Sequence, residues 1–498
     1  MGSVAMSEVD YADIQGLVRF GYGQMSRAKY LLVRIKQVDA AKSWLRSASF
    51  TSAVAAKPVP NTALNLAFTA AGLTALGVTD SVMAQFSHEF RGGMAEESRA
   101  RQLGDIGTNA PANWRWGRHG EEPHAVVMFF AKSGGLQAFV ESAKGDSWAK
   151  AFEEVTSLDT SDLDEKEPFG FADGISQPQI DWELKRATPC TQWEYTNVCA
   201  LGEFLLGYRN EYGKFTERPL LDAAESNADL LDAIDAPQKK DLGRNGTYLV
   251  MRQLEQDVRG FWRFLHEQAG GDPAEASSLG ARMVGRTEAG NPLVPVQTKP
   301  IAGMDPARLQ QNQFTYESDP AGERCPFGAH VRRANPRTTD FPERSVGLLK
   351  KLLIVLGFGS NEFRSDLISS VRFHRVLRRG REYGRGLSPS DAINPSTSDE
   401  EERGLHFICL NANICRQFEF LQNAWIANTK FAGMTGESDP LLGNREPIEG
   451  CPATSDFNLP EDGKLRRRIS GLPQFVTVRG GGYFFLPSLR ALRYLARA

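Results

Sequence analysis

His330 is the histidine of this chain whose neighbours best suit a flat, anionic ligand. A glycine and an alanine directly precede its imidazole, so such a ligand could approach closely, and three arginines follow, the last of them Arg337. One imidazole with nearby guanidinium groups suits a haem, where the iron takes an axial histidine and the propionates pair with cations. The alternative is a core histidine beside a solvated basic turn, the commoner case for an isolated histidine.

Asp173 is the second candidate, in the segment 168–178 (PFGFADGISQP). Phe169 and Phe171 could desolvate its carboxylate, and a desolvated carboxylate has a raised pKa and can exchange a proton near neutral pH. An Asp-Gly pair is also the strongest short signal for a tight hairpin turn. From the residues alone, the structural turn is the stronger interpretation.

Arg378 is the third candidate, in the segment 373–384 (FHRVLRRGREYG). Five arginines lie between positions 372 and 381, which usually indicates a solvated edge. In strand alternation Arg378 would share a face with the apolar Val376. An arginine buried there would need an anion, or a negative charge that develops during a reaction, to offset its desolvation.

The other histidines and the cysteines predict no familiar metal site. None of the seven histidines forms an HxxxH or HExxH spacing. A metal-binding trio of His330, His374 and His406 is possible in principle, but the spacing does not favour it. The six cysteines include no CxxC pair, which argues against a disulfide framework and a zinc ribbon and fits a reducing compartment.

The composition excludes several classes of protein. Lys and Arg number 58 against 61 Asp and Glu, a net charge of −3, whereas a nucleic-acid binder is normally strongly basic. Hydrophobic residues at 41% and charged residues at 24% are typical of a globular chain. The start of the chain lacks the apolar stretch of a signal peptide, and no window reaches the roughly 18 apolar residues of a membrane span. We therefore expect a cytoplasmic protein with neither a nucleic-acid nor a membrane partner.

Strands interleaved with amphipathic helices would position these residues, in both halves of the chain. The predicted strands with their following helical patterns are 30–35 with 38–45, 65–77 as a strand-to-helix transition, 124–130 with a helix from 136, 246–252 with 254–265, and 405–410 with a helix carrying Phe418, Leu421 and Trp425. Two closing strands, FVTV and YFFL, flank three glycines. The pattern predicts an α+β duplication, although no residue-level repeat is visible.

The predicted organisation follows from this duplication. Two stretches, 388–403 and 435–463, are predicted to be surface loops because they are rich in Ser, Gly, Pro and acidic residues. The predicted parts of the chain are a flexible N-terminus (1–11), a first unit (12–216), an acidic linker (217–243) and a second unit (244–498).

The three candidate segments, in the order in which they occur along the chain, resemble those of the dye-decolorising peroxidase (DyP-type) family of haem enzymes. Residues 170–174 (GFADG) resemble the family's GxxDG signature, the run around His330 resembles its proximal-haem segment, and residues 376–384 resemble its distal-arginine segment. Further matches extend the resemblance over about residues 12 to 490: DIQG at 13–16, GEFLLGYRNEYG at 202–213, residues 404–422, and FVTVRGGGYFFLP at 475–487.

The resemblance implies a fold and a cofactor. The fold is a pair of ferredoxin-like α+β units forming a dimeric α+β barrel-type fold, with one haem b per chain in the second unit. His330 would be the iron ligand, with Asp173 and Arg378 on the opposite, peroxide-binding face. Glu419 resembles the acidic partner of the proximal imidazole, and Arg337 resembles a propionate anchor.

The resemblance also implies an activity. Leu405 and Phe407 resemble the apolar residues that shape the distal pocket. Asp173 would move the proton of hydrogen peroxide and Arg378 would stabilise the charge of O–O cleavage, after which dyes and phenolics are oxidised by one-electron steps. A carboxylate in this role predicts an acidic activity optimum. The oligomeric state, monomer or homodimer, stays open.

Two alternatives remain beside the peroxidase. One is a haem-binding or haem-handling protein with only incidental peroxidase activity, and the other is a non-haem binding or structural protein. The sequence also departs from some family members at Arg379-Gly380, where they carry an Asp-Asn pair. The distal hydrogen bonds would then depend more on Asp173 and Arg378.

Overall fold

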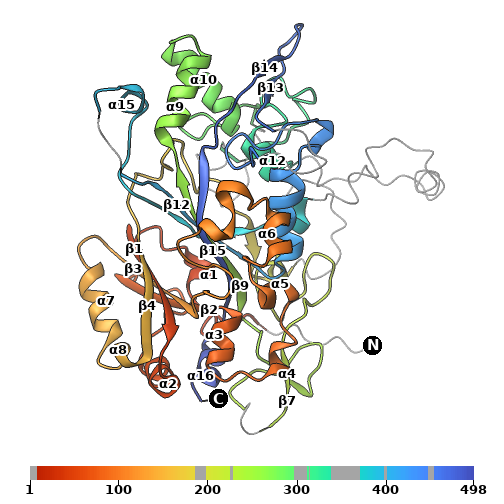
Figure 1. Cartoon of the computed structure of the whole chain (residues 1–498). Helices are drawn as coiled ribbons and strands as arrows, with labels where there is room; N and C mark the ends of the chain where they lie inside the picture. The colour runs from red at the N-terminus through yellow and green to blue at the C-terminus, as the bar shows by residue number, and fades with distance from the viewer. Residues whose placement is uncertain are drawn as a thin grey trace, which may run out of the picture.

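The computed structural model describes residues 8–185, 198–224, 228–296, 311–312, 314–337, 371–397, 401–446 and 454–497. Part of the predicted flexible N-terminus (residues 1–7) lies outside these ranges. The strands of the central sheet fall into two groups, at residues 27–159 and 247–486. Each group builds one half of a central sheet (Figure 1).

The first group is a ferredoxin-like unit with the order β-α-β-β-α-β. Its strands lie side by side as β4-β1-β3-β2, and all the pairings are antiparallel. The predicted strands and helices are confirmed with small shifts in their ends. The elements are β1 (Arg27–Ile35), α2 (Val38–Ser47), β2 (Thr62–Phe68), β3 (Ala125–Ala131), α7 (Leu136–Lys144) and β4 (Phe152–Asp159).

The second group repeats the same topology. Its strands lie in the order β10-β12-β9-β15, and β11 also pairs with β12. The elements are β9 (Thr247–Gln256), α9 (Val258–Gln268), α10 (Pro273–Val284), β10 (Leu377–Arg378), β11 (Arg381–Tyr383), β12 (Gly404–Asn411), the π-helical η7 (Cys415–Glu419) and η8 (Leu421–Ala427), and β15 (Val476–Leu486). The predicted α+β duplication is therefore confirmed.

One pairing joins the two units. Phe485 of β15 lies opposite Phe68 of β2, which makes the two sheets continuous at the centre of the molecule (Figure 1). The inner strands are buried on both faces, since alternate side chains of β3 enter two different cores. Val127 and Phe129 belong to one core, and Met128 and Phe130 belong to the other.

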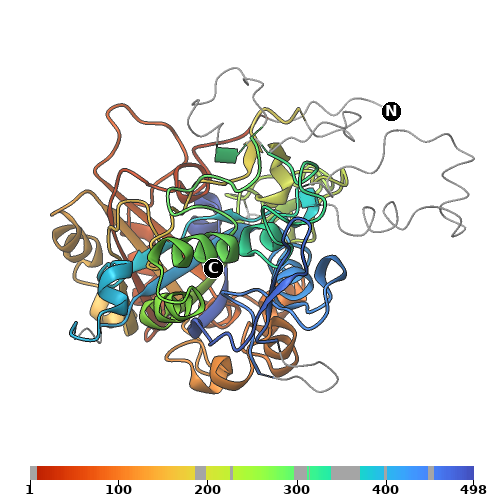
Figure 2. The same cartoon turned by 90° about the horizontal axis from the view of Figure 1, so that it is seen from above.

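Helices α9 and α10 lie in front when the molecule is seen from above (Figure 2), and α15, β13 and β14 lie at the same end of the molecule (Figure 1). Shorter elements cover the sheet and its ends. These elements are α1 (Leu17–Phe20), α3 (Ala70–Ala75), α4 (Asp80–Met83), α5 (His88–Gly92), α6 (Glu97–Leu103), η1 (Gly107–Asn109), η2 (Pro111–Asn113), α8 (Trp148–Ala151), β5 (Gln179–Asp181), β6 (Val198–Ala200), η3 (Leu201–Glu203), β7 (Leu220–Asp222), β8 (Lys239–Asp241), α12 (His330–Ala334), η6 (Val371–His374), α15 (Pro389–Ile393), η9 (Phe431–Gly433), β13 (Phe457–Leu459), β14 (Arg467–Ile469) and α16 (Leu489–Leu495).

The predicted linker, 217–243, contains ordered structure where it is described. Its β7 and β8 pair with each other, and Arg218 is buried in ion pairs with Asp235 and Asp241. It runs between the two groups of strands, but the domain boundaries themselves stay a proposal. Within the described residues, we find no helix with both the length and the apolar character needed to cross a bilayer.

The prediction of two closing strands is wrong. The three glycines lie inside one continuous strand, β15, with a register shift between Val478 and Gly480. Glycine is required within this strand for a steric reason, because Trp116 packs directly on the strand. A Cβ built on Gly480 would lie 2.4 Å from the indole Nε1 of Trp116, so only glycine fits beneath the ring.

A Gly480→Ala substitution tests this contact. Because the added methyl would overlap the Trp116 ring, we expect a loss of about 1–3 kcal/mol of unfolding free energy, the usual cost of overpacking. Urea denaturation measures it. Gly23→Ala is the matched control, since nothing lies within 4 Å of its Cβ position. Equal stabilities of the two variants would contradict the packing argument.

Candidate active site

A cavity of about 340 Å³ lies against the second unit, where segments distant in the sequence meet. Its walls are mainly apolar, and its polar groups include side chains from the segment 167–178, β9, α12 and β10. The lining includes Phe169, Phe171, Asp173, Ser176, Arg252, Arg286, His330, Arg337, Arg375, Arg378, Leu405, Phe407, Phe418, Leu441 and Val476. A large apolar cavity with a few convergent polar groups is the usual form of a ligand or active site.

Asp173 reaches the cavity from a segment whose backbone conformation favours glycine at two positions. Gly170 has φ +100° and Gly174 has φ +71°, a region that other residues rarely adopt. The Asp173 N–H donates to the Glu165 carbonyl oxygen at 2.9 Å, and the Ala172 N–H donates to that of Glu288 at 3.0 Å. The hydrogen-bonded turn lies at residues 167–170, closed by the Gly170 N–H and the Glu167 carbonyl oxygen, and Gly174 lies only at a bend. The prediction of a tight hairpin turn at the Asp-Gly pair is therefore wrong, but the segment presents the Asp173 carboxylate to the cavity.

Arg378 reaches the same point from β10, 205 positions later in the chain. Its Nη1 donates to Oδ1 of Asp173 at 2.8 Å, and its Nη2 donates to the Ser176 carbonyl oxygen at 3.2 Å. The backbone N–H of Arg378 also donates to Oε1 of Gln177 at 3.0 Å. These bonds tie the two segments together on one side of the cavity.

The Asp173–Arg378 pair keeps the carboxylate ionised. Burial alone would raise the pKa of Asp173, but the charge and hydrogen bond of Arg378 outweigh burial and hold that pKa below its ordinary value. Both side chains keep a surface open to the cavity, with exposed fractions of 40% and 34%. The pair therefore offers a proton acceptor beside a fixed positive charge.

His330 stands at the first position of α12 and also lines the cavity. Its Nδ1 lies 2.9 Å from Oδ2 of Asp439, a carboxylate that is fully buried. Burial lowers the pKa of His330, but the charge of Asp439 more than offsets this and raises it. With Nδ1 held in this way, Nε2 is the ring nitrogen that can bind a ligand in the cavity.

The prediction that Glu419 is the acidic partner of the His330 imidazole is wrong. Glu419 Oε1 accepts hydrogen bonds from Nη1 of Arg99 at 2.5 Å and from the Tyr483 hydroxyl at 2.8 Å. Asp439 takes the predicted place instead. The helical segment that carries Glu419 turns this side chain toward α5 and α6, where Arg99 compensates its charge.

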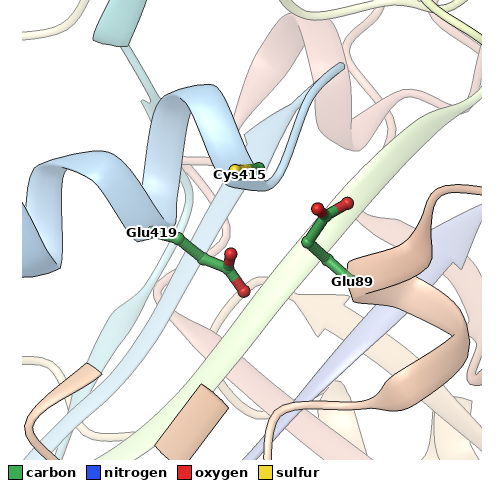
Figure 3. A group of neighbouring side chains, drawn as sticks. All are labelled: Glu89, Cys415 and Glu419. Carbon is green, nitrogen blue, oxygen red and sulfur yellow. The ribbon is translucent and has the colours of Figure 1, made fainter. Parts of the chain in front are cut away.

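Figure 3 shows the surroundings of Glu419. Its carboxylate faces that of Glu89, and Cys415 lies one turn earlier on the same helical segment. The ligand atoms of these three residues lie within 4.8 Å of one another. Arg99 already supplies a positive charge to Glu419, so we assign no metal to this group.

Asp439 was missed because it lies in the stretch 435–463 that the sequence predicts to be a surface loop. Its residues 437–439 are instead buried. Arg333 holds this stretch against α12, since its Nη2 donates to the Glu437 carbonyl oxygen at 2.6 Å. One local signal was available: the Asp-Pro-Leu-Leu sequence forms a turn in which the N–H groups of Leu441 and Leu442 donate to Asp439 Oδ1.

Arg337, Leu405 and Phe407 all line the cavity. Arg337 is almost fully buried, and its Nη1 donates to the carbonyl oxygens of Asn312 at 2.6 Å and Phe314 at 3.2 Å. Leu405 and Phe407 are half-buried and share one face of β12. All three are therefore near enough to contact a ligand in the cavity.

His374 and His406 also line the cavity, but both are held by backbone carbonyl groups. His374 Nδ1 lies 2.5 Å from the Arg416 oxygen, and His406 Nε2 lies 3.0 Å from the Asp159 oxygen. Burial lowers the pKa of each to about 4. Over the described ranges, these two rings and His330 do not gather into a metal site.

Arg379 and Gly380 contribute no polar side chain to the cavity. Arg379 turns the other way, and its Nε and Nη2 donate to the Leu17 and Val18 carbonyl oxygens at 2.8 and 2.7 Å. A Cβ on Gly380 would lie 2.4 Å from the His406 carbonyl oxygen. Glycine is therefore needed for the close approach to β12.

The comparisons with known proteins identify the family. A family model described as the DyP dimeric alpha+beta barrel domain matches residues 25–161. The dye-decolorizing peroxidase msp1 of Mycetinis scorodonius is 30% identical, over 97% of this chain and 87% of its own length. The chain belongs to the dye-decolorizing peroxidase family. The recognition made from the three sequence segments is confirmed.

Solved structures of dye-decolorizing peroxidases share the fold. A fungal DyP-type peroxidase from Auricularia auricula-judae has a TM-score of 0.72 and 25% identity, covering 99% of this chain and all of its own. A dye-decolorizing peroxidase whose heme pocket was engineered for asymmetric sulfoxidation has a TM-score of 0.71 and 26% identity, with the same coverage. The predicted fold class and the enzyme class, a DyP-type peroxidase, are both confirmed.

The structural role of Glu419 in this dye-decolorizing peroxidase is testable. Arg99→Met would leave the Glu419 carboxylate buried without its cation, so we expect a loss of about 3–5 kcal/mol of unfolding free energy in urea denaturation. Arg101→Met, at an exposed position of the same helix, should cost far less. The double variant Arg99→Met/Glu419→Leu should regain part of the loss. Equal effects of the two single variants would contradict the assignment.

Proposed function

We propose that this peroxidase uses one haem b, which the cavity would hold through Nε2 of His330, and that Asp173 and Arg378 would act on the hydrogen peroxide bound there. The observation that carries the proposal is the convergence of His330 and the Asp173–Arg378 pair on one cavity. A proton acceptor, a fixed cation and an imidazole are the groups that a haem peroxidase needs.

The residues that line the cavity fit a haem. The hydrogen bond from His330 to Asp439 fixes the ring orientation and makes Nε2 more electron-donating. Phe407, Leu405 and their neighbours supply apolar walls for the porphyrin faces. Arg337 is our candidate partner for a propionate, since a guanidinium pairs well with a carboxylate.

Asp173 is the proposed acid–base group. Because its pKa is held low, it is ionised at mildly acidic pH and can accept the proton from one oxygen of hydrogen peroxide. It then returns this proton to the other oxygen, which leaves as water when the O–O bond breaks. The same proton is taken and given back, so Asp173 ends the step ionised.

Arg378 is the proposed charge stabiliser. Negative charge grows on the departing oxygen as the O–O bond breaks, and a fixed guanidinium beside the cavity stabilises that charge. A bound haem would supply the iron-based redox chemistry that reduces the peroxide. Organic donors, proposed to be dyes and phenolics, supply the two electrons for this reduction one at a time.

Variants of the pair test the proposal. We expect Asp173→Asn to lower the rate constant for the reaction with hydrogen peroxide by about 10²–10⁴, the usual contribution of a general acid–base group. Arg378→Leu should lower it by about 10²–10³. Stopped-flow absorption measures both. Asp164→Asn, the same chemical change at an exposed neighbouring position, is the control and should react normally.

The pH dependence gives the same test a second readout. The rate should fall as pH drops through the pKa of Asp173, since only the ionised carboxylate accepts a proton. Because Arg378 lowers that pKa, Arg378→Leu should move this acidic limb to higher pH, and Arg378→Lys should move it less. Full peroxide turnover in both Asp173→Asn and Arg378→Leu would instead favour a haem-handling protein.

A further inference from the structure

A second carboxylate, Glu167, lines the same cavity six positions before Asp173 and has no part in the mechanism above. Its Oε1 accepts a hydrogen bond from the Phe171 N–H at 2.9 Å, and its Oε2 accepts one from the Phe169 N–H at 3.0 Å. One side chain therefore fixes two backbone groups of the turn that leads to Asp173.

The backbone of Glu167 closes the same turn. Its N–H donates to the Phe171 carbonyl oxygen at 2.9 Å, and its own carbonyl oxygen accepts from the Gly170 N–H at 2.8 Å. Gln256, near the end of β9, adds a bond from its Nε2 to Glu167 Oε2 at 2.7 Å. Glu167 thus connects the turn to the central sheet.

The aromatic residues of the turn are fixed on their other side by α9. The Phe169 ring lies 4.5 Å from the Phe261 ring, the Phe171 ring is parallel to that of Trp262, and Trp262 Nε1 donates to the Phe169 carbonyl oxygen at 3.0 Å. The turn is therefore held between Glu167 and α9, and Asp173 follows Phe171 by two residues.

Keeping a carboxylate at this position has a cost. Burial raises the pKa of Glu167 to about 7, and the nearby negative charge of Asp173 adds to the rise, while the N–H donors lower it. A neutral glutamine of the same size would avoid the desolvation cost. It could not replace the carboxylate, because its NH₂ group would face one of the two backbone N–H donors.

We propose that Glu167 is a positioning residue for Asp173: its two carboxylate oxygens hold the 167–171 turn so that Asp173 meets both Arg378 and the peroxide. The proposal rests on the proposed role of Asp173. A positioning role differs from a merely stabilising role, because a positioning residue affects the reaction only through Asp173.

A double-mutant cycle in the holoenzyme, measured above pH 7 where the Glu167 carboxylate is ionised, tests this. We expect Glu167→Gln to lower the peroxide rate constant by about 10²-fold, since small displacements of a reacting group cost that much. In the Asp173→Asn background the same change should alter the rate by no more than about twofold, because there is no carboxylate left to position. Glu167→Asp, which keeps the charge but has a shorter reach, should lie between wild type and Glu167→Gln.

Hydrogen exchange supplies a readout that is independent of activity. Mass spectrometry of the peptide that spans residues 167–175 should show exchange about tenfold faster in Glu167→Gln, since one of the Phe169 and Phe171 N–H groups loses its acceptor. Glu165→Gln is the matched control: its side chain is exposed, and the bond from the Asp173 N–H to the Glu165 carbonyl oxygen remains. It should change neither the exchange nor the rate.

The outcomes separate the two proposals. A normal peroxide rate or normal exchange in Glu167→Gln overturns the positioning role alone, provided that Asp173→Asn is slow. An equal loss with and without Asp173 also overturns it and leaves a structural role. A normal rate in Asp173→Asn overturns the proposed function and the positioning role together.

Discussion

The hydrogen bond between His330 and Asp439 is the interaction on which the site depends. The Asp439 carboxylate is fully buried, and its pKa is kept low because the charge of His330 and several N–H donors outweigh the effect of burial. Arg333 fixes both partners, since it follows His330 on α12 and binds the backbone at Glu437. With Nδ1 held by this carboxylate, the other ring nitrogen faces the cavity in one orientation.

The duplicated fold brings the opposite side of the site together. Asp173 lies after β4, the last strand of the first group, whereas Arg378 lies on β10, an edge strand of the second group, and the two meet at 2.8 Å. The turn that precedes Asp173 packs on α9, so the first half of the chain contributes to a cavity that the second half mostly encloses.

Sequence reasoning was accurate where local pattern decides the structure. Short apolar runs predicted β1, β3 and β12. The motifs selected His330, Asp173 and Arg378, which line one cavity, while their roles stay a proposal. Sequence reasoning was wrong where contacts between distant residues decide. Glu419 is buried against Arg99, and Asp439 is buried although its segment is polar and rich in glycine and proline. The glycines of β15 allow the close packing of Trp116 at Gly480 and of Met94 and Trp114 at Gly481. Such contacts leave no periodic pattern in a single sequence.

The most direct measurement is the iron–histidine stretching band in the resonance Raman spectrum of the ferrous, haem-loaded enzyme. A hydrogen bond donated by Nδ1–H to a carboxylate makes the imidazole a stronger electron donor and strengthens its bond to the iron. Our account predicts that Asp439→Asn shifts this band to lower frequency, while Glu419→Gln leaves it in place. A band unchanged in Asp439→Asn, or shifted only in Glu419→Gln, would contradict the account.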